Sequence, residues 1–164
     1  MTTIREFVKT VQESGIDIVE HVHKVIEDVK LINEEYNYFN AISEDLALQQ
    51  ASNLKKNPKG KLAGVVVSVK DSICVKGVES TAGSRILKGY YPLFNATVID
   101  KVIKEGGIII GKTAQDEFGF GGFSTNVGLG YKIPKNPFDK ERSTGGSSGG
   151  CAGITKKLDY PHIS

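Results

Sequence analysis

The sequence predicts an α/β fold in which helices cover a β-sheet. Two short runs rich in β-branched residues, 62–69 and 108–110, are bounded by turn residues and have the composition of strands buried on both faces. Between them, residues 96–105 carry apolar side chains at helical spacing. A strand, a helix and a second strand in this order indicate that the two strands pair in parallel.

Three helices are expected before the first strand. Thr3 followed by Glu6 forms a capping box that starts a short amphipathic helix. Asp17 precedes a second helix, in which valine and isoleucine recur at three- and four-residue spacing. Ser43 is expected to cap a third helix, which ends at the Asn-Pro-Lys-Gly turn of residues 57–60.

Composition and charge narrow the class of protein. With 164 residues, 39% hydrophobic and 24% charged, the chain is expected to form one soluble globular domain. Its net charge of +2 comes from 21 basic and 19 acidic residues, without a basic run that would follow a phosphate backbone. No stretch approaches the roughly 18 apolar residues of a membrane span, and the N-terminus lacks an apolar signal core. We therefore expect a cytoplasmic protein that contacts neither a membrane nor, directly, a nucleic acid.

The histidines and cysteines do not indicate a metal site. His21 and His23 are two residues apart, so on a helix they point in different directions, and we expect them in solvent or on a helix flank. Cys74 and Cys151 are expected to be reduced thiols, because the chain shows neither a secretory signal nor a dense cysteine framework.

The glycine-rich stretch of residues 145–150, Gly-Gly-Ser-Ser-Gly-Gly, allows three interpretations. It can be a flexible linker, an anion-binding loop, or a tight turn that presents a serine for chemistry. The turn signal of residues 136–139 argues against a linker. Cys151 follows directly, but no His-Asp or His-Asn pair can be assembled around it. We therefore expect this thiol to pack beneath the loop.

Residues 106–113 fit the Gly-x-x-x-x-Gly-Lys-Thr pattern of nucleotide-binding loops. That pattern needs a loop whose amides surround phosphate groups, whereas Ile108–Ile110 is a β-branched run typical of a strand. We therefore interpret this segment as a strand.

Lys70 is a candidate base only in combination with Ser147. It closes the strand predicted over residues 62–69, where burial would lower the pKa of an ammonium group and yield a neutral amine. Taken alone, Lys70 is an ordinary strand-end lysine. Nothing in the sequence shows that it lies near Ser147.

The chain carries a set of motifs at residues 69–71, 96–98, 111–113, 116–118, 136–137 and 145–150. In their order and approximate spacing, these motifs resemble those of the amidase signature family over most of the length of the chain. The match within residues 116–118 and 39–41 looks more like the A subunits of tRNA-dependent amidotransferases than like general acylamide hydrolases.

The resemblance implies a mixed sheet covered by helices and a Ser-Ser-Lys mechanism. Lys70 would be the base, and Ser147 the bridging serine beside a cis peptide, which passes a proton from the nucleophile. The substrate would be glutamine, and the partners would be the B and C subunits of the amidotransferase. No cofactor is expected in this chain, because ATP and Mg²⁺ are used by the B subunit, and tRNA is reached only through the complex.

The end of the chain departs from the family pattern. Residues 1–154 follow it, whereas residues 155–164 are charged, contain Pro161 and lack an apolar period, so we expect them not to continue the family's helix. The family's acyl-forming serine lies roughly two dozen residues beyond the bridging serine, which is past Ser164. We therefore expect the chain alone to be an inactive, truncated portion. The alternatives are a fragment of a general acylamide amidase and a non-catalytic remnant or binding module.

Overall fold

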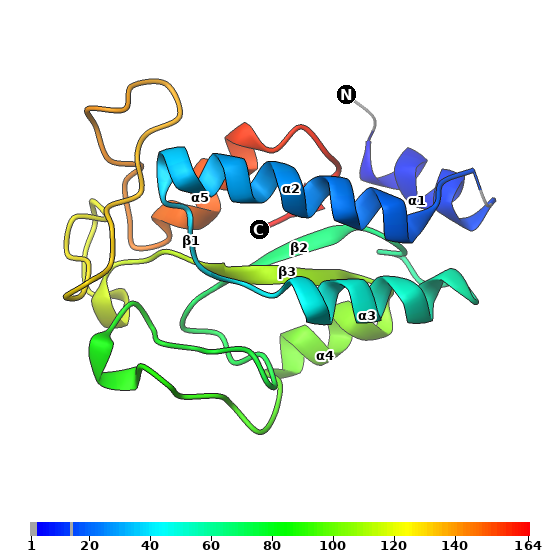
Figure 1. Ribbon diagram of the computed structural model, residues 1–164, viewed down its shortest axis with the longest axis horizontal. Coiled ribbons are helices and arrows are strands. Elements are labelled where there is room, and N and C mark those ends of the chain that lie inside the picture. The colour runs from blue at the N-terminus through cyan, green and yellow to red at the C-terminus, as the bar shows by residue number, and fades with distance from the viewer. Residues whose placement is uncertain (1–2, 14) are drawn as a thin grey trace.

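The computed structural model describes residues 3–13 and 15–164. A four-stranded mixed sheet forms the centre, with α1 and α2 on one side and α4 on the other (Figure 1). The predicted α/β fold with a mixed sheet covered by helices is confirmed. The elements are α1 (Ile4–Gln12), α2 (Ile18–Tyr36), β1 (Phe39–Ile42), α3 (Glu44–Lys55), β2 (Val66–Lys70), η1 (Arg85–Leu87), α4 (Thr97–Lys104), β3 (Ile108–Thr113), η2 (Glu117–Gly119), α5 (Gly149–Lys157) and β4 (His162–Ile163).

The strands lie in the order β1-β3-β2-β4. β2 and β3 pair in parallel, as the strand-helix-strand pattern predicted, while β1 is antiparallel to β3 and β4 is parallel to β2. β2 starts at Val66 and not at Leu62. The φ of Gly64 is +78°, and its N–H donates to the carbonyl of Gly106 at 3.1 Å. The chain therefore turns at this glycine before it becomes extended.

Of the two predicted helix caps, Thr3 and Ser43, only that of Thr3 is present. The Thr3 hydroxyl accepts from the Glu6 N–H, and the Glu6 carboxylate accepts from the Thr3 N–H. Asp17 caps α2. Ser43 precedes α3 but does not cap it, because its hydroxyl donates to the carbonyl of Ile109 at 3.1 Å. This serine therefore ties the start of α3 to β3.

Apolar side chains form one cluster on each face of the sheet. Val66 and Ile108 face the larger cluster, which α1, α2, α3 and α5 complete. Val67 and Ile109 face the smaller cluster, where Ile99 of α4 packs against them. Both faces of β2 and β3 are thus covered, which explains why their sequences are continuous apolar runs.

The last residues of the chain pack against the rest of the fold. The expectation that residues 155–164 do not continue the helix is wrong for the first three of them, since α5 runs to Lys157. Lysine near a helix C-terminus is favourable, and Pro161 lies beyond the helix end. The Tyr160 hydroxyl donates to Asp28 of α2 at 2.7 Å. β4 then pairs with one edge of β2.

His21 also differs from the expectation of a solvent-facing or flanking side chain. Its ring centroid lies 4.8 Å from that of Phe7 and 5.6 Å from that of Tyr160. Its Nε2 atom is buried without a hydrogen-bond partner in the part of the chain that the structure describes. Burial, and secondarily the charge of Lys24, lowers the pKa of His21.

Within residues 3–13 and 15–164, no helix combines the length and the apolar character needed to cross a membrane. The same residues contain no group of three or more His, Cys, Asp and Glu side chains placed to hold a metal ion. Cys74 and Cys151 are free thiols, and the Cys151 Sγ lies 3.0 Å from the Thr113 hydroxyl, beneath the glycine-rich loop.

Candidate active site

The structure brings the two predicted site residues together. Lys70 is the last residue of β2, and Ser147 precedes α5. The Lys70 Nζ donates a hydrogen bond to the Ser147 Oγ at 2.8 Å, although 77 residues separate them in the chain. Both residues are half-buried. A lysine and a serine hydroxyl in direct contact can pass a proton between them.

The backbone around Ser147 is held on both sides. The peptide bond between Gly146 and Ser147 is cis, as the resemblance implied. The Gly146 N–H donates to the Gly122 carbonyl at 2.9 Å, and the Ser147 carbonyl accepts from the Asp116 N–H at 3.0 Å. Beyond Ser147, the Gly150 N–H donates to the Ala114 carbonyl at 2.9 Å. The flexible-linker interpretation of residues 145–150 is therefore wrong.

Asp116 organises the loop that supports Ser147. Its carboxylate is fully buried and accepts from the backbone N–H of Ser124 at 3.1 Å and of Asn126 at 3.0 Å. A Cβ atom at Gly121 or Gly146 would collide with this carboxylate. In the sequence, Asp116 belongs to a family motif without an assigned role. The sequence pattern that could have indicated this role is an acidic residue followed within a few positions by repeated glycines.

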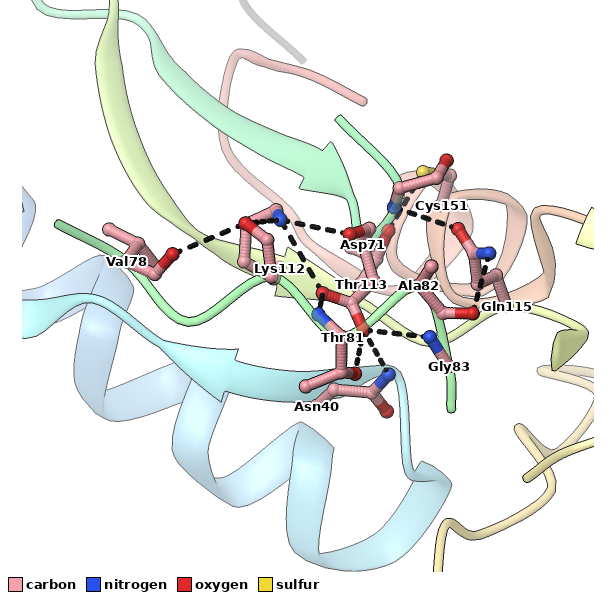
Figure 2. Close-up of polar contacts among 12 residues, drawn as sticks. Asn40, Asp71, Val78, Thr81, Ala82, Gly83, Lys112, Thr113, Gln115 and Cys151 are labelled. Atoms are coloured by element: carbon pink, nitrogen blue, oxygen red, sulfur yellow. Dashed lines mark hydrogen bonds and ion pairs between the residues drawn. The ribbon is translucent and has the colours of Figure 1, made fainter. Parts of the chain in front are cut away.

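On the other side of β2, Asp71 and Lys112 form a buried ion pair (Figure 2). The exposed fraction of the side chain is 0% for Lys112 and 1% for Asp71, and their charged atoms lie 3.4 Å apart. The Lys112 Nζ also donates to the Ser80 hydroxyl at 2.6 Å and to the Asp71 carbonyl at 3.0 Å. Burial lowers the pKa of Lys112, and Asp71 opposes this effect. In the sequence, both residues belong to motifs of the family resemblance, but no contact between them was predicted.

The Asp71 carboxylate also accepts hydrogen bonds from two other segments, β1 and the segment after β2. It accepts from the N–H of Thr81 at 3.1 Å and from its hydroxyl at 2.5 Å, from the N–H of Gly83 at 3.0 Å, and from the amide of Asn40 at 2.9 Å (Figure 2). β1 and the segment after β2 are therefore fixed to the residue next to Lys70.

The nucleotide-binding interpretation of residues 106–113 is excluded by these contacts. Ile108–Thr113 is strand β3, and all of its residues are buried. The lysine of the pattern, Lys112, is paired with Asp71 inside the protein. The interpretation of this segment as a strand is confirmed.

A mixed sheet covered by helices, with a lysine at the end of β2 in contact with a serine before α5, is typical of the amidase signature proteins. The model of the family described as Amidase matches residues 20–155. The chain belongs to this family.

Similar sequences also support membership of this family. The chain is 39% identical over 148 residues to the A subunit of glutamyl-tRNA(Gln) amidotransferase from Sulfurisphaera tokodaii, a match that covers 90% of this chain and 31% of the relative. It is 41% identical over 139 residues to the chloroplastic/mitochondrial A subunit from Arabidopsis thaliana, covering 82% of this chain and 25% of the relative. The chain thus spans a third or less of the length of these relatives.

Solved structures agree on the fold. A bacterial aryl acylamidase of the amidase signature family superposes with a TM-score of 0.83 at 27% identity, covering 93% of this chain and 33% of that protein. The A subunit of glutamyl-tRNA(Gln) amidotransferase from Thermotoga maritima superposes with a TM-score of 0.72 at 29% identity, covering 93% of this chain and 31% of that protein.

Proposed function

We propose that this chain supplies the base and the bridging serine of a glutamine-hydrolysing amidase, the A subunit of a tRNA-dependent amidotransferase. The 2.8 Å hydrogen bond between Lys70 and Ser147 carries the proposal. The 39% identity to the Sulfurisphaera tokodaii protein supports the choice of glutamine as the substrate.

The contact supports a Ser-Ser-Lys mechanism. A serine hydroxyl is a weak nucleophile at neutral pH, so attack on an amide carbonyl requires a nearby base. Lys70 in its neutral form accepts the proton of Ser147, while Ser147 accepts the proton of the attacking serine. The same two groups then return a proton to the departing ammonia. The 2.8 Å contact holds Lys70 and Ser147 in a geometry suited to this proton transfer.

We propose that the attacking serine belongs to another segment of the A subunit. Family resemblance places it roughly two dozen residues beyond the bridging serine, and this chain spans 31% of the Sulfurisphaera tokodaii relative. Residues 1–164 alone therefore supply two of the three catalytic groups, and we propose that they do not hydrolyse glutamine without the third.

The proposed setting is the amidotransferase complex in the cytoplasm. Ammonia released in the A subunit would pass to the B subunit, which uses ATP and Mg²⁺ to amidate glutamate on tRNA(Gln), and the C subunit would link the two. This chain would then bind no cofactor and meet tRNA only through the complex.

A general acylamide amidase is the second candidate. It is favoured by the superposition on the aryl acylamidase, whose TM-score of 0.83 exceeds the 0.72 of the Thermotoga maritima protein. The two candidates share Lys70 and Ser147 and differ in the amide that they cleave.

A chimera distinguishes them. Residues 1–154 are joined, at the matched position, to the remaining part of the Sulfurisphaera tokodaii relative, and ammonia release from glutamine is compared with hydrolysis of an acyl anilide. We expect a higher kcat/KM for glutamine and co-purification with the B and C subunits of the same organism. A higher kcat/KM for the anilide would favour the acylamidase. A folded chimera that cleaves neither amide would contradict both candidates.

A further inference from the structure

A cavity of about 280 Å³ lies on the face of the sheet opposite to the Lys70–Ser147 pair. Lys70 and Thr113 are paired across the sheet and point toward α5, where Thr113 contacts Cys151. Successive strand residues point to opposite faces, so Lys112, which precedes Thr113 in β3, points away from α5. Asp71 pairs with Lys112 on that face and lines the cavity. A ligand in the cavity would therefore not touch the Ser147 hydroxyl.

The cavity is lined by three separate segments, which the Asp71 carboxylate partly holds together. Asn40 of β1 and Thr81 both donate hydrogen bonds to it, and both line the cavity. Residues 129–131 form the third wall. Hydrogen bonds to Asp71 thus hold two of the walls in place, and largely preformed walls are usual for sites that bind small molecules.

Two cations at the rim have no anionic partner. Arg85 and Lys88 lie at the two ends of the short η1 turn, and both line the cavity. Within residues 3–13 and 15–164, none of the ion pairs includes either side chain. Both are therefore available to a ligand carboxylate, which the planar guanidinium of Arg85 can bind through two hydrogen bonds.

Two carboxylates line the same cavity. Asp71 is already satisfied by Lys112 and by hydrogen bonds from its neighbours. Glu79 is half-buried and accepts one hydrogen bond, from the Gly89 N–H at 2.6 Å through its Oε1 atom. Its Oε2 atom has no hydrogen-bond partner within the described ranges. Glu79 is therefore the group that can accept from a ligand ammonium.

We propose that this cavity binds a small zwitterion of the free α-amino acid class, with its carboxylate at Arg85 and Lys88 and its ammonium at Glu79. A phosphate group would meet the repulsion of the Glu79 carboxylate, and a simple amine that of the Arg85 and Lys88 cations. Ala41 and Leu129 also line the cavity and provide apolar contact for a short side chain. The volume is near the lower end for ligand sites, roughly 300 Å³ and above, which limits the ligand to a small amino acid.

The test is a titration of the ¹⁵N-labelled chain, observed through its backbone amide resonances. L-alanine is compared with propionate and ethylamine, which lack its amino group and its carboxylate respectively, and with inorganic phosphate. We expect saturable shifts at Asn40, Thr81 and Gly130 with L-alanine at millimolar concentration, and affinities at least about tenfold weaker for the other three probes. Equal or tighter binding of propionate, ethylamine or phosphate would overturn the zwitterion assignment, and the lack of a saturable shift would overturn the site.

Variants locate the two charged contacts. Arg85→Gln and Glu79→Gln are each expected to weaken L-alanine binding about tenfold, and Lys88→Gln replaces Arg85→Gln if that variant does not fold. Lys61→Gln, an exposed lysine beside a different cavity, is the matched control. Unchanged affinity in the Arg85 and Glu79 variants would contradict the proposal. Binding of L-alanine is measured without catalysis, and we expect it to be unchanged in Ser147→Ala. A failure of this binding proposal can therefore be distinguished from a failure of the proposed function.

Discussion

Replacing Lys112 by methionine is expected to destabilise the fold by about 3 kcal/mol. The Lys112 side chain is completely buried, and its Nζ contacts the carboxylate and the carbonyl of Asp71 and the hydroxyl of Ser80. Methionine fills a similar volume but leaves the buried carboxylate without its counter-ion. Removing one partner of a buried ion pair costs about 3–5 kcal/mol. We take the lower end because the Asp71 carboxylate keeps its hydrogen bonds from Thr81, Gly83 and Asn40.

The free energy of unfolding is measured by urea denaturation of the parent chain and the variant. For a chain of this size, a loss of about 3 kcal/mol corresponds to a fall in Tm of roughly 6–12 °C. Lys101→Met on the exposed face of α4 is the matched control and is expected to change stability by less than about 0.5 kcal/mol. If Lys112→Met lowers the free energy of unfolding by less than about 1 kcal/mol, the reasoning is refuted, because an unpaired buried carboxylate should destabilise the fold by more than that.

Two further predictions concern the loop at Ser147 and the packing of α1. A Cβ atom at Gly146 would collide with the Asp116 carboxylate, so Gly146→Ala should lower the unfolding free energy by roughly 1–3 kcal/mol. In the control variant Gly122→Ala, the new Cβ meets nothing within 4 Å, so the urea midpoint should stay nearly unchanged. Equal effects of the two variants would argue against close packing of Gly146 on Asp116. Burial lowers the pKa of His21 below 6.5, so the folded state binds fewer protons than the unfolded state as the pH falls through 6.5, and stability should decrease there. His21→Phe should flatten this part of the pH profile of the urea midpoint, whereas an unchanged slope would assign it to other groups.

Local patterns predicted the framework of the fold. The β-branched runs and the apolar spacing between them were sufficient for β2, α4 and β3, because these elements follow one another closely in the chain and the two strands are buried on both faces. The same patterns excluded a phosphate-binding loop at residues 106–113. Thr3 was predicted as a cap because a cap depends on residues only two or three positions away.

Long-range contacts account for what the sequence did not show. Lys70 and Ser147 lie 77 residues apart, so only family resemblance joined them before the structure did. Lys112 looked like part of a strand, and its partner Asp71 lies 41 residues away. The last residues lack a local helical pattern, yet contacts such as that between Tyr160 and Asp28 hold them in place. Tertiary packing outweighs local propensity at such positions.

The most direct test of the central claim is the rate of ammonia release from glutamine by the chimera with the Sulfurisphaera tokodaii relative, compared among the parent, Lys70→Ala, Ser147→Ala and the control Lys101→Ala. If Lys70 and Ser147 form the proton relay, each of their variants should lose about 10³-fold or more in kcat, the two losses should not add in a double variant, and Lys101→Ala should match the parent. A folded Lys70→Ala or Ser147→Ala variant that retains kcat within about tenfold of the parent would contradict the account.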